Sequence, residues 1–381
     1  MDNLQAVLAL EDGAIFHGIP FGALATHECR GEVVFATAMT GYQEICTDPS
    51  YRGQMVVLTY PLIGNYGTSE DDAESRRPWL AALIVHEVCE QYSHWHATES
   101  ISSYLARYDI LGIADVDTRA LTRHLRLHGT KRGIIRVCET AAWPEAKELI
   151  QAAQRVEPIS NLDVVGEVTV PDTCFELTSS LVGTSHQPRI VIVDTGVKYN
   201  IARCLAQRGL EVVLVPYSVS PDELLALHPD GIVLPNGPGD PESVQVVIEL
   251  ISYLIPSRIP LMGICLGHQL LALAAGARTS RLPFGHHGAN HPVKDVRTGR
   301  VTITSQNHNF QVDAASIPPS SGFHVSHINL LDHSVEGLYH ERYPIFSLQY
   351  HPEASPGPCD NRYFFDRFAE LVRSGTVVGT Y

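Results

Sequence analysis

The sequence predicts two domains, an N-terminal α+β domain followed by a three-layer, flavodoxin-like α/β domain. The chain has 381 residues, which is too long for one ordinary hydrophobic core. Strand-like and helical segments alternate regularly only in the second half. A polar stretch containing Thr, Ser and Pro separates the two halves. We therefore expect an N-terminal domain at 1–160, a connection at 161–188 and a second domain at 189–381.

The first domain begins with a predicted β-hairpin. Residues 5–10 are apolar, 11–13 have the composition of a turn, and 14–17 resume the strand pattern. Further strands are expected at 32–36, 55–60, 80–85 and 110–113.

Two helices are expected after these strands. Asp117 can cap the first, which carries Leu121 and Leu125 and ends at Gly129. The second covers 144–156 and has its apolar residues on one face. Because strands and helices in this half follow no regular βαβ order, the pattern indicates an α+β domain.

The second domain has a regular order of strands and helices. Buried strands are expected at 189–193, 211–215, 231–234 and 260–264. Helices between them end at Gly209 and Gly276, and a final helix at 362–372 carries an apolar face. This alternation predicts a parallel sheet covered on both faces, whose ligands lie beyond the carboxyl ends of the strands.

Composition excludes several classes of protein. With 27 basic and 42 acidic residues, the net charge of −15 argues against a nucleic-acid partner. No apolar run approaches the ~20 residues that span a bilayer, and the first residues lack the basic start of a signal peptide. The eight cysteines have no paired spacing, which indicates reduced thiols and a cytoplasmic location.

Cys265 is the candidate nucleophile. It is the centre of a Gly-Ile-Cys-Leu-Gly motif that follows a predicted strand and precedes a predicted helix. A turn tight enough to present a side chain there needs glycine on both sides, here Gly263 and Gly267. The helix start favours the thiolate, and the amide of Leu266 can donate to an oxyanion. The alternative is a buried cysteine that only fills space.

His351 is the candidate acid–base group. It lies at the end of a predicted strand, and Pro352 disfavours helix at this point. Residues two apart in an extended chain point the same way, so Glu353 can reach the imidazole and fix its tautomer. The alternative is a polar strand end followed by a surface glutamate.

A rigid loop follows the strand at 231–234. Residues 236–241 read Asn-Gly-Pro-Gly-Asp-Pro, and their exposed amides suit an oxyanion donor or a clamp on an amino-acid ligand. No Gly-Lys-Ser/Thr follows, so the loop is not a phosphate loop. A plain turn is the alternative.

Together these three motifs resemble those of the class I glutamine amidotransferases, in the same order and at the same sheet positions. The resemblance covers the chain from about residue 189 to its end. It implies that Cys265 attacks the carboxamide of L-glutamine, that His351 protonates the departing ammonia and that Glu353 orients His351.

The first half resembles the amino-terminal domain of the small-subunit family of carbamoyl phosphate synthetases. The resemblance rests on residues 31–35, 39–44, 47–51 and 59–67, and residues 284–294 extend it into the second half. It implies that the L-glutamine contacts lie at Ser50, Gly237, Gly239, Leu266, Gln269, Asn307, Asn309 and Phe310. Asn309 stands where the family generally has Gly, and Asn is the least costly substitute if the backbone needs a positive φ.

The resemblance also implies the partners. Carbamoyl phosphate synthesis consumes ATP, but the chain has no phosphate loop, so a large subunit would use ATP and Mg and receive ammonia through a tunnel. The pair would form a heterodimer serving arginine and pyrimidine biosynthesis. This chain itself is expected to bind no cofactor and no metal. The spacing of the His and Cys residues at 86–96 fits no standard zinc site, and the histidines at 286–291 are better explained as polar groups of a loop.

Two other functions stay open at this point. The chain could serve a different synthetase, such as an anthranilate-type synthase. It could also be a non-catalytic module that senses glutamine, although the predicted Cys, His and Glu argue against this.

Overall fold

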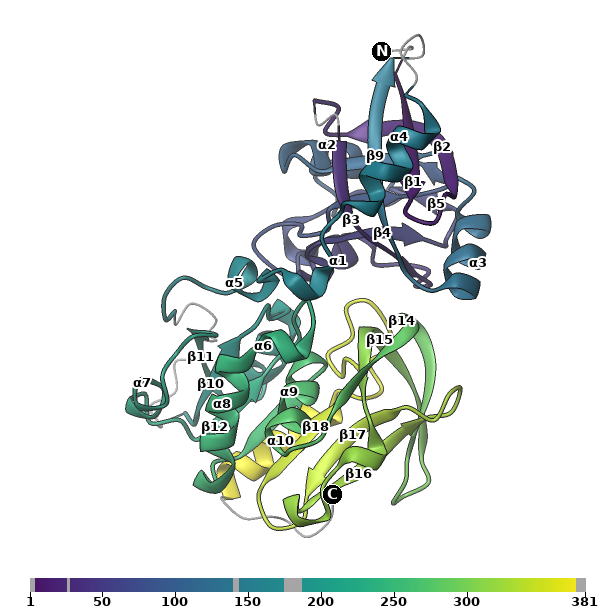
Figure 1. Cartoon of the computed structure of the whole chain (residues 1–381). Coiled ribbons are helices and arrows are strands. Elements are labelled where there is room, and N and C mark those ends of the chain that lie inside the picture. The colour runs from purple at the N-terminus through teal and green to yellow at the C-terminus, as the bar shows by residue number, and fades with distance from the viewer. Residues whose placement is uncertain (1–3, 26–27, 140–143, 175–186, 375–381) are drawn as a thin grey trace. The chain divides into compact units, whose positions relative to one another are not determined.

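The structure is a computed structural model that describes residues 4–25, 28–139, 144–174 and 187–374. The chain divides into two compact units (Figure 1). Unit 1 comprises Met1–Val164 with Pro283–His287, and unit 2 comprises Val165–Leu282 with Gly288–Tyr381. The short helix α5 (Val164–Val168) begins within the predicted connection. The middle of that connection, residues 175–186, lies outside the described residues.

Unit 1 is built around a closed β-barrel. Its strands in spatial order are β1 (Leu4–Leu10), β2 (Ile15–Gly22), β8 (Leu111–Ala114), β6 (Ala82–Ile84), β4 (Gln54–Leu58), β3 (Glu28–Ala36) and β9 (Lys131–Glu139). The predicted hairpin is confirmed, because β1 and β2 pair antiparallel with Ala6 opposite Gly18. The sequence prediction does not contain β9, which pairs with both β1 and β3 and thereby closes the barrel. Closure removes the exposed edges that an open sheet would have.

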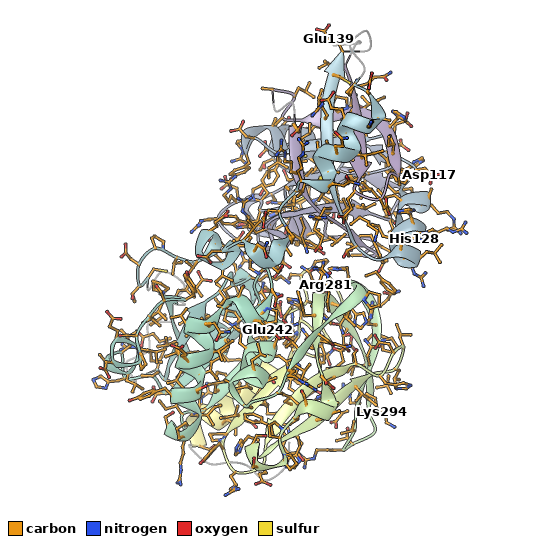
Figure 2. All side chains as sticks on the ribbon, viewed as in Figure 1. Asp117, His128, Glu139, Glu242, Arg281 and Lys294 are labelled. Carbon is orange, nitrogen blue, oxygen red and sulfur yellow. The ribbon has the colours of Figure 1, made fainter. Side chains whose placement is uncertain are left out.

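The helices of unit 1 surround the barrel (Figure 1). They are α1 (Tyr42–Thr47), α2 (Ile101–Arg107), α3 (Thr118–His128) and α4 (Ala146–Gln154), with 3₁₀ turns at Pro49–Tyr51, Glu70–Asp72 and Ile159–Asn161 and a small sheet of β5 (Leu62–Ile63) and β7 (Glu87–Val88). The predicted cap of α3 is confirmed, since Oδ1 of Asp117 accepts from the Ala120 amide at 2.8 Å. Asp117 and His128 mark the two ends of this helix in Figure 2.

Residues 283–287 add a late segment of the chain to unit 1. The ring of Phe284 stacks on Phe35, with 6.1 Å between the centroids. The amide of Thr37 donates to the carbonyl of His287 at 3.1 Å. These contacts lie within the resemblance noted at 284–294, and they explain why that segment groups with the barrel.

Unit 2 contains one nine-stranded sheet. Its strands in spatial order are β11 (Glu211–Pro216), β10 (Arg189–Asp194), β12 (Gly231–Leu234), β13 (Leu261–Ile264), β18 (Ile345–Leu348), β17 (Val335–His340), β16 (Phe323–Asn329), β14 (Thr279–Asp295) and β15 (Val301–Val312). The first five are parallel, as predicted. From β18 onward the sheet continues through antiparallel strands that the sequence prediction does not contain.

Helices cover both faces of the parallel strands, which confirms the three-layer prediction. The helices are α6 (Tyr199–Ala206) and α10 (Tyr363–Ser374) on one face and α7 (Pro221–Ala226), α8 (Gln245–Leu254) and α9 (Leu266–Ala274) on the other, with 3₁₀ turns at Pro241–Ser243, Ile255–Ser257, Ala314–Ser316 and Pro319–Ser321. Strand β10 shows why both faces need cover. Val191 and Val193 enter one core while Ile190 and Ile192 enter the other, and all four are fully buried.

All eight cysteines lie within the described residues, and each is a free thiol. No described helix combines the length and the apolar character that a membrane crossing requires.

Candidate active site

Cys265 stands at the turn between β13 and α9. Its backbone is left-handed, with φ 53°, an unfavourable conformation for a residue with a side chain. A Cβ on Gly267 would lie 2.0 Å from the carbonyl oxygen of Leu234, and one on Gly263 would lie 2.8 Å from the carbonyl oxygen of Gly267. Both flanking glycines are therefore required by close backbone approach, as the elbow motif predicts.

The amides at the start of α9 are arranged around Cys265. The amide of Gly267 donates to the carbonyl of Pro235 at 3.0 Å, and the amide of His268 donates to the carbonyl of Cys265 at 3.1 Å. Within the described chain the amide of Leu266 has no backbone acceptor. It is therefore available to an oxyanion that forms at the cysteine, and the positive end of the helix adds to this stabilisation.

His351 and Glu353 form a buried pair just beyond β18. Nδ1 of His351 lies 2.6 Å from Oε1 of Glu353, and both side chains are almost completely buried. The amide of His351 donates to the carbonyl of Ser305 at 2.9 Å, which fixes the strand end that carries the imidazole. The short Nδ1 contact leaves Nε2 as the nitrogen for a proton exchange with the substrate.

Each member of this pair stabilises the charged form of the other. Burial by itself lowers the pKa of His351, but the carboxylate of Glu353 and the sulfur of Cys265 outweigh it and raise the pKa to about 10. Burial likewise raises the pKa of Glu353, but Lys198 and His351 outweigh it and lower the pKa to about 2. Nε2 of His351 makes no hydrogen bond of ordinary geometry within the described residues, although Cys265 is near enough to act on its pKa.

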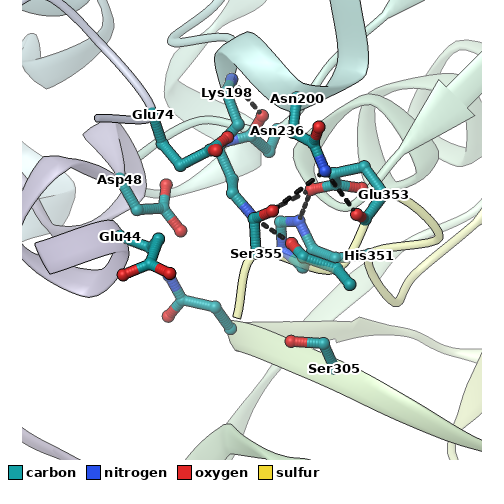
Figure 3. A network of polar contacts seen from close by, with 12 residues as sticks. Glu44, Asp48, Glu74, Lys198, Asn200, Asn236, Ser305, His351, Glu353 and Ser355 are labelled. Carbon is teal, nitrogen blue, oxygen red and sulfur yellow. Dashed lines mark hydrogen bonds and ion pairs between the residues drawn. The ribbon is translucent and has the colours of Figure 1, made fainter. Parts of the chain in front are cut away.

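Lys198 also belongs to this cluster, although the sequence motifs do not predict it. Its Nζ lies 3.1 Å from Oε1 of Glu353 and 2.5 Å from the carbonyl of Ala354 (Figure 3). Its amide donates to the side-chain oxygen of Asn236 at 3.0 Å. One signal was available: a lysine shortly after the end of a buried strand, at the edge of the sheet where ligands bind.

The loop after β12 brings two of the predicted glutamine contacts to the same sheet edge. A Cβ on Gly237 would lie 2.2 Å from the carbonyl oxygen of Thr195 and 2.7 Å from the side chain of Leu266. Gly239 has φ +91°, which favours glycine. The hydroxyl of Thr195 donates to the carbonyl of Asn236 at 3.0 Å, so the loop is tied to the turn after β10.

Strand β15 supplies further predicted contacts. The thiol of Cys265 donates to the carbonyl of Asn307 at 3.4 Å. Nε2 of Gln269 donates to the carbonyl of Phe310 at 2.8 Å. Asn309 lies between them in the extended strand and is not among the described non-glycine residues with positive φ. Asn309 therefore does not occupy a backbone position with positive φ, where Gly would be favoured.

Ser50 is the one predicted contact in unit 1. It lies in the 3₁₀ turn Pro49–Tyr51, where it is buried and its amide donates to Oδ1 of Asp48 at 2.9 Å. The other predicted contacts and the three candidate catalytic residues all belong to unit 2.

The histidines and cysteine at 86–96 have protein partners of their own. Nδ1 of His86 lies 3.1 Å from the carbonyl of Val116, and the thiol of Cys89 donates to the carbonyl of Gln91 at 3.0 Å. Nε2 of His96 lies 3.1 Å from a carboxylate oxygen of Asp71.

The fold of unit 2 and the arrangement around Cys265 indicate an amidotransferase of the glutamine-dependent class. Residues 191–371 match the model of the class-I glutamine amidotransferase family, and residues 8–135 match the carbamoyl-phosphate synthase small chain domain.

Relatives that match over nearly the whole chain identify the family more closely. The chain is 51% identical to a carbamoyl phosphate synthase small chain of Symbiobacterium thermophilum, over 97% of this chain and 99% of that one. Small chains of Solidesulfovibrio magneticus (46%, 98% of this chain and 100% of that one) and Archaeoglobus fulgidus (45%, 97% and 99%) are similar over nearly their whole length. The chain belongs to the family of carbamoyl phosphate synthase small chains. The family predicted from the motifs is thereby confirmed, and an anthranilate-type synthase is not supported.

Proposed function

We propose that the chain hydrolyses L-glutamine through a thioester on Cys265 and supplies the ammonia to a large synthetase subunit. The observation that carries the proposal is the position of Cys265 at a strained elbow beside the buried pair of His351 and Glu353. A nucleophile, an acid–base group and an orienting carboxylate are the parts that acyl transfer by a thiol needs.

In the first half of the reaction, Sγ of Cys265 attacks the carboxamide carbon of glutamine. The amide of Leu266 stabilises the oxyanion, and the glycine loop at 237–239 supplies the second donor. Nε2 of His351 takes the thiol proton as the carbon–sulfur bond forms and then gives this proton to the nitrogen, which leaves as ammonia when the carbon–nitrogen bond breaks. The product on the enzyme is a glutamyl thioester.

In the second half, a water molecule clears the thioester. His351 takes a proton from the water as the water attacks the thioester carbon, and it returns this proton to the sulfur when the carbon–sulfur bond breaks and glutamate leaves. The thiol is restored, so the sum is glutamine plus water to glutamate plus ammonia. Glu353 holds the imidazole in one tautomer throughout, and Lys198 neutralises the carboxylate so that it can be buried.

The family supports a heteromeric enzyme. Its name, small chain, supports a large subunit as the partner that uses ATP and Mg to form carbamoyl phosphate from bicarbonate and ammonia. The glycine loop of this chain is not followed by the Gly-Lys-Ser/Thr of a phosphate loop, so ATP use fits the partner. We assign the complex to the cytoplasm and its product to arginine and pyrimidine synthesis.

Replacing the nucleophile tests this proposal. Cys265→Ser in the complex is expected to lose glutamine hydrolysis by roughly 1,000-fold or more, since the triad acts as a unit. Carbamoyl phosphate synthesis from added ammonia should persist, because the partner carries that chemistry. Glutamine hydrolysis at the wild-type rate in Cys265→Ser would show that the nucleophile is another residue.

A labelling experiment separates an enzyme from a glutamine-sensing module. An electrophilic glutamine analogue should modify Cys265, and excess L-glutamine should slow the modification. Cys359 is exposed and provides an internal control, since its labelling should not respond to glutamine. Absence of labelling at Cys265 would favour the sensing module.

A further inference from the structure

The segment after His351 has an unusual backbone conformation. Ala354 and Ser355 both have left-handed backbones, with φ 62° and 54°. Two consecutive left-handed residues with side chains are costly, and such a conformation persists only where the surroundings impose it. Because Glu353 directly precedes these two residues, whatever imposes their conformation also fixes the backbone from which the Glu353 carboxylate projects.

Asn200 is the side chain best placed to impose it. Its Nδ2 donates to the carbonyl of Glu353 at 2.6 Å and to the hydroxyl oxygen of Ser355 at 2.9 Å (Figure 3). One amide group thus spans the left-handed corner, binding the residue before it and the second residue within it. Asn200 is buried, so water cannot readily replace these bonds.

The side chains around Asn200 bind other parts of the same segment. Lys198, two residues earlier, binds the carboxylate of Glu353 and the carbonyl of Ala354. The hydroxyl of Ser305 donates to the carbonyl of Pro356 at 2.8 Å. Lys198 therefore carries the charge of the cluster and Ser305 holds the far end of the segment. Asn200 binds the carbonyl of Glu353 at 2.6 Å, closer than the guanidinium of Arg362, which lies 3.4 Å from the same oxygen.

We propose that Asn200 is a positioning residue for the Glu353–His351 pair, acting through the backbone of Glu353. The inference rests on the proposed glutaminase function. It adds a requirement that the motifs around Cys265 and His351 do not show: a hydrogen-bond donor at the start of α6.

The test compares two substitutions that differ in shape and in chemistry. Asn200→Ala removes the donor and the volume, whereas Asn200→Asp keeps the shape and places an oxygen against the Glu353 carbonyl. For the full chain in complex with its large subunit, kcat for glutamate release should fall roughly 10- to 100-fold in both variants. KM for glutamine should change less than about twofold, because the bonds that Asn200 makes go to Glu353 and Ser355 and not to a predicted substrate contact.

The pH profile separates positioning from general damage. With Glu353 misaligned, the imidazolium of His351 loses support and its pKa falls, so the limb of kcat/KM that reports His351 should move to lower pH. Asn361→Ala is the matched control: it removes a buried amide whose hydrogen bond goes to the carbonyl of Ile303 at 3.3 Å, away from the Glu353 segment. It should lower stability without moving the limb.

The outcomes distinguish this inference from the proposed function. Wild-type kcat and an unmoved profile in Asn200→Asp, alongside an inactive Cys265→Ala, would overturn the positioning role alone. Absence of glutamine hydrolysis in the wild-type complex would overturn the proposed function itself. Loss in Asn200→Ala with full activity in Asn200→Asp would assign Asn200 to packing and also overturn the role proposed.

Discussion

The ammonium of Lys198 lies 3.1 Å from a carboxylate oxygen of Glu353, and both side chains are almost fully excluded from water. The same oxygen lies 2.6 Å from Nδ1 of His351. Lys198 and Glu353 cancel each other's charge, which leaves His351 and Cys265 to exchange a proton without adding net charge to a buried site.

Replacing Lys198 should show how far the buried Glu353 carboxylate depends on the lysine charge. Lys198→Met removes the ammonium beside the buried Glu353 carboxylate, and breaking such a pair costs about 3–5 kcal/mol. We expect the free energy of unfolding to fall by about that amount and glutamine hydrolysis to fall with it. Urea unfolding and glutamate release measure the two effects.

An exposed ion pair provides the comparison. Arg278 lies 3.4 Å from Asp313, and its side chain is 76% exposed. Arg278→Met should change stability by less than about 1 kcal/mol, because exposed pairs are screened by water. Equal losses in the two variants would contradict the special weight given to Lys198.

The extent to which the sequence predicts this site follows from how local each feature is. Cys265 and its glycines form one turn, and His351 and Glu353 lie two residues apart on one extended segment, so short motifs contain their geometry. Lys198 reaches Glu353 across 155 residues of sequence. That contact depends on the order of β10, β12, β13 and β18 in the sheet, which no local pattern specifies.

The same distinction applies to the fold. The parallel strands of unit 2 were predicted because buried runs alternating with helices have few other arrangements. The barrel of unit 1 was not, because its closure depends on β9 pairing with β1 and β3, both more than 90 residues earlier in the chain. Strand β14 was also missed, since its burial follows no simple alternation.

The pKa shifts of the buried pair predict how stability depends on pH. The pKa of His351 is raised from 6.5 to about 10, so its contribution is complete below pH 6.5 and is lost as the pH rises toward 10. The pKa of Glu353 is lowered from 4.5 to about 2, so its contribution is complete above pH 4.5 and is lost as the pH falls toward 2. Stability contributed by the pair should therefore be greatest between these limits.

Replacing the histidine isolates the alkaline side of this dependence. His351→Asn should unfold at a urea midpoint that declines less between pH 6.5 and 10 than that of the wild type. His324→Asn is a suitable control, because His324 is exposed and lies 3.5 Å from Glu341. An unchanged alkaline decline in His351→Asn would show that other groups cause it.

The glycine after the elbow should tolerate no side chain. A Cβ on Gly267 would collide with the carbonyl of Leu234, so Gly267→Ala must displace backbone and should cost about 3 kcal/mol with loss of glutamine hydrolysis. Gly299 has nothing within 4 Å of a Cβ, although its φ is +75°. Gly299→Ala should cost about 1 kcal/mol and leave activity intact. Thermal unfolding and glutamate release distinguish the two variants.

Asn309 provides a test of how glutamine is held at β15. The strand is extended there and its φ is not positive, so glycine has no conformational advantage. Asn309→Gly should therefore lower stability by about 1 kcal/mol through the added freedom of the unfolded chain. The backbone of the strand keeps its direction in that variant, so KM for glutamine should stay within about twofold. Gln311→Gly, two residues further along the same strand, should show the same cost in stability. A tenfold lower KM in Asn309→Gly alone would instead mean that the asparagine side chain obstructs the substrate, and that glycine serves this position by its size.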